Sequence, residues 1–264
     1  MKDISHDYYL RYVDPVVYDQ ILAFHTKGNF TIHDSTQKLT SLHYIADRQM
    51  DTLTGNQLKL YPGTPLITLT DASKAIESDL YRNESCEHFV DKPIGFDTIK
   101  TIFTPLLSKK TYSYKRGYPS AGALYPVEIF VCSLSERELE WPCPEKILHL
   151  LPYSRQFEVI KNTEDTAILK KAILASPGNI GTPNIALVYA AYMPKSVFKY
   201  RYRGYRHALM ETGSMYMLID LQIKKMGLQS RLWSAYTDSM LCKAIGVNPA
   251  LFLPLCVQFI GLAK

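Results

Sequence analysis

Apolar positions recur with helical spacing in two stretches of this 264-residue chain. Between residues 96 and 107 they return every three or four positions, which predicts a helix from about Phe96, capped by Asp97 or Thr98. Residues 205–226 are apolar on nearly all sides, which is typical of a helix in a large core or a subunit interface. Gly227 is expected to end that helix, and residues 239–245 predict another short one.

Runs of β-branched and aromatic residues predict strands over residues 127–132 and 146–153. Residues 184–192 are apolar without interruption, which predicts a strand buried on both faces of a sheet. A last strand is expected over residues 255–260. Helices that alternate with buried strands indicate an α+β or α/β sandwich around one sheet.

The first 75 residues are more weakly patterned than the rest of the chain. We expect residues 1–75 to form an N-terminal lobe appended to a domain over residues 76–264. Aromatic and valine side chains between positions 8 and 18 predict a partly buried helix, and residues 59–63 predict a strand end that enters a turn.

Composition narrows the class of protein. Hydrophobic residues make up 47% of the chain and charged residues 21%, which excludes a disordered protein. A net charge of +5 suits an anionic cofactor and is too small to indicate nucleic acid by itself. The start has no signal peptide, and the longest apolar run is half a membrane span, so we expect a soluble, cytoplasmic protein without a membrane partner.

The five cysteines are odd in number and no two lie within four residues, which favours reduced thiols. The seven histidines show no HxH or HExxH spacing, so no metal site is expected.

The segment before the predicted strand at 127 could approach a ligand closely. Small residues at 119–122 would let backbone amides reach a ligand face, Ser120 adds a hydroxyl, and Arg116 offers a positive fork for a phosphate. A tight turn before a strand has the same residue types, so this interpretation stays open.

Basic residues and tyrosines are mixed over residues 198–206. Such a mixture occurs in single-strand nucleic-acid platforms and on solvated basic faces. A third interpretation is catalytic, because a lysine among like charges loses its proton more readily and a neighbouring tyrosine can exchange a proton.

Two weaker signals lie elsewhere in the chain. Arg82 with Ser85 would suit a phosphate. Trp233 or Tyr236 could stack on an aromatic ring, although such aromatics more often belong to a core.

Four segments together resemble a known family. They are Arg-x-x-Ser at 82–85, Arg-Gly-Tyr-Pro-Ser-Ala-Gly-Ala-Leu-Tyr-Pro-Val-Glu at 116–128, the long basic and apolar run at 198–216, and Trp-Ser-Ala-Tyr-Thr-Asp-Ser at 233–239. The chain is similar over residues 80–261 to the azoline dehydrogenases, the flavin-dependent, nitroreductase-like subunits of thiazole/oxazole peptide synthetases.

The resemblance implies an α+β fold with a mostly antiparallel sheet flanked by helices, an N-terminal extension, and FMN held at a homodimer interface. It implies oxidation of peptide thiazolines and oxazolines to thiazoles and oxazoles. The expected partners are E1-like and YcaO-type cyclodehydratase subunits and a precursor peptide, with no nucleic acid. The alternative on the same fold is a general NAD(P)H-dependent nitroreductase or flavin reductase.

The resemblance also assigns residues. It places the catalytic pair at Lys199 and Tyr200, with Arg201 and Arg203 beside the lysine. The cofactor would contact Arg82, Ser85, Arg116, Pro119, Ser120, Ala121, Gly122, Arg231, Trp233, Ser234 and Ala235. Glu87 stands where the wider family has a second basic residue, so Arg116 or Arg231 is expected to compensate.

Overall fold

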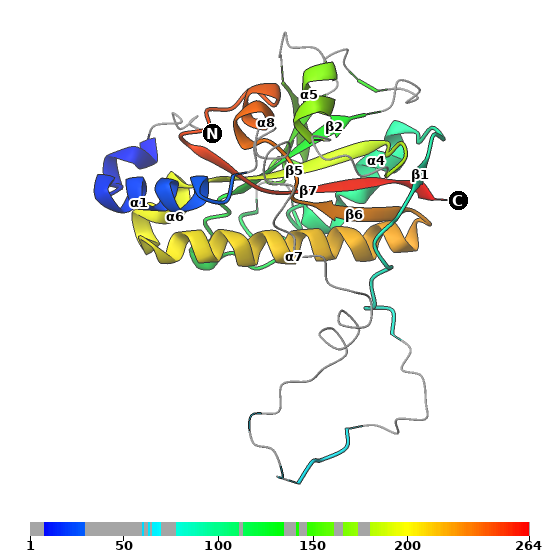
Figure 1. Cartoon of the computed structure of the whole chain (residues 1–264), viewed down its shortest axis with the longest axis horizontal. Coiled ribbons are helices and arrows are strands. Elements are labelled where there is room, and N and C mark those ends of the chain that lie inside the picture. The colour runs from blue at the N-terminus through cyan, green and yellow to red at the C-terminus, as the bar shows by residue number, and fades with distance from the viewer. Residues whose placement is uncertain are drawn as a thin grey trace, which may run out of the picture.

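The computed structural model describes residues 8–29, 60, 63, 65–69, 78–110, 113–134, 141–142, 147–160, 166–173 and 180–263. Within these described residues, seven strands form one sheet in the order β1-β7-β5-β2-β3-β4, with β6 also paired to β7, and every pair of named strands is antiparallel (Figure 1). The strands are β1 Phe89–Val90, β2 Val127–Ser133, β3 Ile147–Leu151, β4 Gln156–Val159, β5 Ile185–Tyr192, β6 Gln229–Trp233 and β7 Phe252–Ala263.

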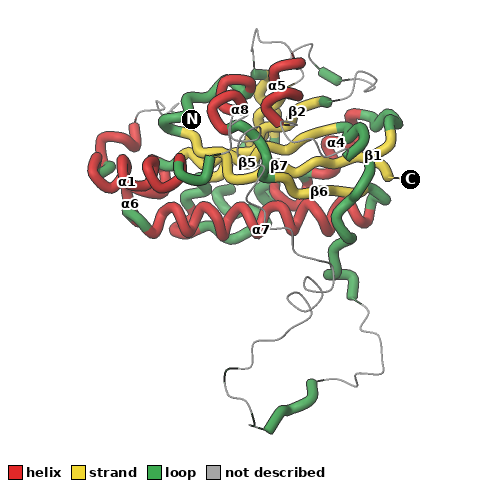
Figure 2. The backbone as a smooth tube through the Cα atoms, in the orientation of Figure 1, coloured by secondary structure: helices red, strands yellow, loops and turns green. Residues whose placement is uncertain are grey.

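Helices lie on both sides of the sheet (Figures 1 and 2). The α-helices are α1 Pro15–Thr26, α4 Phe96–Ile102, α5 Thr166–Ile173, α6 Pro194–Tyr200, α7 Arg203–Lys225 and α8 Asp238–Ala244. The 3₁₀ turns are η1 Tyr8–Tyr12, η2 Thr104–Leu106 and η3 Ala121–Ala123. One core packs α4 and α7 against the sheet, and a second core packs α5 and α8 against its other face. The predicted α+β class with a helix-flanked antiparallel sheet is therefore confirmed.

The central strands divide their side chains between the two cores. In β2, Ile129 and Val131 belong to the core under α7, whereas Phe130 and Cys132 belong to the core under α5 and α8. This follows from the two-residue period of a strand. All eight residues of β5 are buried, as the uninterrupted apolar run predicted.

Most elements expected from the sequence are present, with corrections at their ends. The helix predicted from Phe96 is present as α4, but it ends at Ile102 and the 3₁₀ turn η2 follows it. Its predicted cap was wrong, because Gly95 precedes the helix and makes no side-chain cap. The single helix expected over residues 8–18 is two helices, since Pro15 begins α1 and Asp14 caps it by accepting the backbone N–H groups of Val16 and Val17. Residues 59, 61, 62 and 146 of two predicted strands lie outside the described residues.

The N-terminal helices pack onto the rest of the protein. The Tyr18 hydroxyl donates to the Ala250 carbonyl oxygen at 2.7 Å, and the Tyr9 ring lies 5.5 Å from that of Phe198 in α6. Among the described helices, none combines the length and the apolar character needed to cross a bilayer. The four cysteines within the described ranges are free thiols.

Candidate functional site

The small-residue loop before β2 has a strained backbone. Gly122, Ala123 and Tyr125 all have positive φ angles, of 61°, 53° and 49°. A left-handed conformation at a residue with a side chain costs about 1–3 kcal/mol and persists only where the surrounding structure imposes it. Gly122 and Ala123 are exposed whereas Tyr125 is buried, so only the first part of this strained backbone faces outward.

The two residues expected to be catalytic approach this loop. A Cβ atom on Gly122 would lie 2.6 Å from the Tyr200 hydroxyl and 2.9 Å from Lys199 Nζ. Both side chains come from the last turn of α6, which ends at Tyr200 and is followed by Arg201 with φ 49° and ψ −132°. The Tyr200 ring packs edge-on against His207 at 4.8 Å between centroids. The structure therefore brings together Lys199, Tyr200 and the loop at 119–122.

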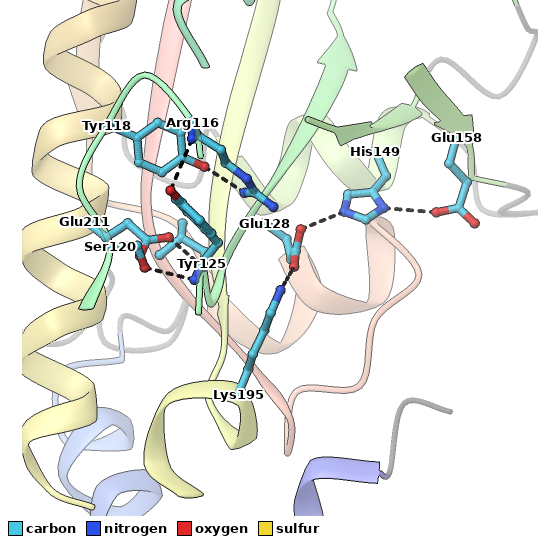
Figure 3. A network of polar contacts seen from close by, with 10 residues as sticks. Arg116, Tyr118, Ser120, Tyr125, Glu128, His149, Glu158, Lys195 and Glu211 are labelled. Carbon is cyan, nitrogen blue, oxygen red and sulfur yellow. Dashed lines mark hydrogen bonds and ion pairs between the residues drawn. The ribbon is translucent and has the colours of Figure 1, made fainter. Parts of the chain in front are cut away.

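A buried carboxylate lies beneath the loop (Figure 3). Glu211 of α7 is 3% exposed, accepts the Val127 N–H at 3.2 Å, and hydrogen-bonds with the Ser120 hydroxyl. Burial raises the pKa of Glu211 to about 7, although these hydrogen bonds and the charges of Arg116 and Lys195 oppose the rise. Our sequence interpretation missed Glu211; its signal was that it is one of only two acidic residues, with Asp220, in the largely apolar stretch 205–226.

The side chain of Arg116 makes its contacts within the protein. Its guanidinium stacks on the Tyr125 ring at 4.1 Å and donates to the Tyr118 hydroxyl at 2.8 Å (Figure 3). The Arg116 backbone N–H also donates to the Tyr125 hydroxyl at 3.2 Å. These contacts brace the start of the strained loop.

A chain of ionisable side chains ties α6 to the sheet (Figure 3). Glu128 of β2 lies 3.3 Å from Lys195 Nζ and 3.2 Å from His149 Nε2, and His149 Nδ1 lies 2.9 Å from Glu158. Burial alone would raise the pKa of Glu128, but the cationic neighbours lower it to about 2. Burial alone would lower the pKa of His149, yet its two glutamates raise it. Lys195 is one helical turn before Lys199, so these ion pairs fix the helix that carries Lys199 and Tyr200.

A second group of candidates lies beside β6. Arg82 donates to Asp220 at 2.6 Å and to the Ser85 hydroxyl at 3.4 Å, and Arg231 donates to the Cys86 carbonyl oxygen at 3.0 Å. Asp220 also accepts from Gln258 at 2.6 Å and from the Ser230 hydroxyl. The Arg82 side chain remains 34% exposed, so part of it is open to an anion. Ser85 lines an adjoining hollow of about 370 Å³.

The three remaining candidates, Trp233, Ser234 and Ala235, lie at the end of β6 and directly after it. The Trp233 indole N–H donates to the Ile173 and Ala235 carbonyl oxygens at 2.8 and 3.0 Å, and its ring packs 5.8 Å from Phe259. Trp233 thus contributes to the core under α5 and α8. Ser234 is exposed and lines a cavity of about 200 Å³ with His25 and Tyr205.

The two groups of candidates are anchored at different turns of α7. Glu211 anchors the loop group and Asp220 anchors the Arg82 group. Nine residues of helix separate them, which corresponds to about 14 Å along the axis and half a turn around it. The two groups of predicted cofactor residues are therefore anchored at separate positions along this helix.

Solved structures define the class of protein. A putative nitroreductase from Ralstonia eutropha superposes with a TM-score of 0.59 at 14% identity, covering 75% of this chain and 88% of that one. The fold is nitroreductase-like, as expected. No protein-family model matches the chain.

A nearer relationship identifies the family. A chain of the Escherichia coli microcin synthetase McbBCD complex, solved with truncated pro-MccB17 bound, matches with a TM-score of 0.88 and 33% identity over 99% of this chain and 98% of that one. The microcin B17-processing protein McbC of Escherichia coli is 34% identical over 252 residues, covering 95% of this chain and 92% of McbC. This chain belongs to the McbC family.

Proposed function

We propose that this protein is an FMN-dependent dehydrogenase that oxidises thiazolines and oxazolines of a precursor peptide to thiazoles and oxazoles. Membership of the McbC family along nearly the whole chain supports this reaction. The observation that carries the proposal is the approach of Lys199 Nζ and the Tyr200 hydroxyl to the bare Gly122 backbone.

The residues present fit FMN. Gly122 leaves an exposed patch of backbone without a side chain, against which a flat ring can lie. Arg82, Ser85 and Arg231 would hold the phosphate, and the Pro119–Gly122 loop would lie against the ring. Because the exposed Glu87 stands where the wider family has a second basic residue, binding of the phosphate would depend mainly on Arg82 and Arg231. Arg116 would act indirectly by bracing the loop, and the segment 233–235 would border the site. When bound, FMN supplies the acceptor for the hydride that leaves the azoline ring.

Aromatisation removes two adjacent ring hydrogens, one as a proton and one as a hydride. The chain supplies the base: either the neutral Lys199 amine takes the proton from the acidic ring carbon, or the Tyr200 phenolate takes it after the phenol has given its own proton to that amine. Arg201 is paired with Asp14 at 2.9 Å, which holds the residue after the pair to the N-terminus of α1. The fixed end of α6 thus orients both groups toward one point on the loop.

We further propose a homodimer in which α7 contributes to the interface. Leu209 and Met210 are 44% and 60% exposed on this helix, so it offers apolar surface to a second copy. A second copy could also complete a cofactor site whose candidate residues are anchored at two separate positions along α7. Because azolines must be formed before they are oxidised, the protein would act with cyclodehydratase subunits on a precursor peptide in the cytoplasm.

The test uses FMN-loaded protein and a peptide that already contains azolines. We expect Lys199→Ala and Tyr200→Phe each to slow the loss of two hydrogens per ring, measured by mass spectrometry, by about 10²-fold or more. Tyr202→Phe is the matched control, because this exposed phenol bonds to Gln20 and should leave the rate unchanged. Near-normal azole formation by both variants of the pair would refute the assignment.

A nitroreductase or flavin reductase is the second candidate, favoured by the match to the Ralstonia eutropha protein. The two functions differ in their reductant. Rapid turnover of NAD(P)H with a quinone would support the second candidate, whereas we expect slow NAD(P)H oxidation and rapid azoline oxidation.

A further inference from the structure

One buried side chain holds both ends of the strained loop. The Glu211 carboxyl accepts the Val127 N–H at one end of the loop (Figure 3). At the other end it hydrogen-bonds with the Ser120 hydroxyl. The Ser120 oxygen in turn accepts the Tyr125 N–H at 2.8 Å. The segment 120–127 is therefore tied to a single turn of α7 through one carboxyl group.

The loop needs such a restraint. Ala123 and Tyr125 have side chains in a left-handed backbone conformation, which relaxes unless neighbouring contacts oppose it. Gly122 lies between the two tied ends and is the point that Lys199 and Tyr200 approach. A shift of the loop would therefore change the distance between its backbone and the proposed base.

We propose that Glu211 is a positioning residue, which holds the 119–124 loop in register with Lys199 and Tyr200 so that a flat cofactor can lie on it. The carboxyl is buried and hydrogen-bonds to the two ends of the loop, so it acts through the loop and does not touch the reacting atoms. This inference rests on the proposed function for the identity of the cofactor.

The first test is FMN affinity of the flavin-free protein at pH 6, followed by quenching of flavin fluorescence. Glu211→Gln keeps an acceptor oxygen, so we expect a Kd within about threefold of wild type. Glu211→Ala leaves the Val127 N–H and Ser120 O–H without their acceptor, so we expect the Kd to rise at least about tenfold. Thr212→Val is the control, because this adjacent buried hydroxyl donates within α7, to the Ala208 carbonyl oxygen.

A second variant keeps the inference testable if Glu211→Ala folds poorly. Ser120→Ala removes the link at the partly exposed loop and leaves the carboxyl in place. We expect it to raise the Kd in the wild-type and Glu211→Gln backgrounds, and to have little further effect beside Glu211→Ala, where the link is already lost. An unchanged Kd in Ser120→Ala, or fully additive effects of Ser120→Ala and Glu211→Ala, would overturn the inference.

Hydrogen exchange of the flavin-free protein separates this inference from the proposed function. We expect faster exchange over residues 121–127 in Glu211→Ala and wild-type exchange in Thr212→Val. Unchanged exchange and unchanged FMN affinity in Glu211→Ala would overturn the role of Glu211 and leave the proposed function standing. A wild-type protein that exchanges normally but binds no FMN would instead overturn the proposed function.

Discussion

At the scale of single residues, Glu211 should make stability depend on pH. Its pKa of about 7 lies above the value of 4.5 for a free glutamate, so its contribution is complete below pH 4.5 and is lost as pH rises through 7. The shift corresponds to about 3 kcal/mol. Between pH 4.5 and 8 we expect the free energy of unfolding of the wild-type protein to fall by an amount of that order. Glu211→Gln should abolish this fall, as measured by urea unfolding. The exposed Asp19→Asn control should keep the wild-type dependence.

Gly122 offers a second test at this scale. Alanine there would adopt a left-handed φ, costing about 1–2 kcal/mol, and its Cβ would displace Lys199 and Tyr200. We expect loss of azoline oxidation with only this modest loss of stability. Gly227→Ala is the matched control, since Gly227 has φ 71° and a Cβ there would meet no atom within 4 Å, so this variant should keep full activity. An active Gly122→Ala protein would contradict the site.

At the scale of elements, the corner between α6 and α7 depends on one glycine. A Cβ on Gly204 would lie 3.0 Å from the backbone carbon of Ser196 in α6. Crowding of this kind typically costs about 1–3 kcal/mol, so Gly204→Ala should lower the free energy of unfolding and move the helix that carries Lys199. Gly213→Ala, in the open middle of α7, should stabilise by about 0.5–1 kcal/mol. Chemical denaturation of both variants measures this contrast.

The elements that the sequence predicted are those with a regular apolar period. β5 was predictable because it is buried along its whole length and is apolar throughout. α7 was predictable because its buried residues recur with the period of a helix. β4 and β6 were missed because their side chains are mostly half-buried or exposed, so alternation is weak. The short helix α6 was missed because its charged and aromatic end suggested a ligand surface.

The candidate site was predictable in part. Resemblance pointed to Lys199, Tyr200 and the 119–122 loop, and the structure places these together. The resemblance could not show that the side chains of Arg116 and Trp233 hydrogen-bond mainly within the protein. The direction of a side chain depends on partners that come close only when the chain folds. Nor could it reveal Glu211, whose role depends on tertiary contact with Ser120 and Val127.

At the scale of the whole molecule, the proposed homodimer can be tested at α7. Replacing both Leu209 and Met210 by glutamate puts two charges on the exposed apolar surface, so we expect the measured mass in light scattering to fall from dimer to monomer. Val159→Glu is the control, because Val159 is similarly exposed on the distant strand β4. A dimer that survives the double change would place the interface elsewhere.

The pairing of β7 has a practical consequence for anyone who edits the gene. This one strand is hydrogen-bonded to β5, β6 and β1, and so it joins segments that begin at residues 89, 185 and 229. A premature stop codon after residue 251 would deprive all three of their shared neighbour at once. Because unpaired strand edges recruit other chains, truncated products of that kind should accumulate as aggregates.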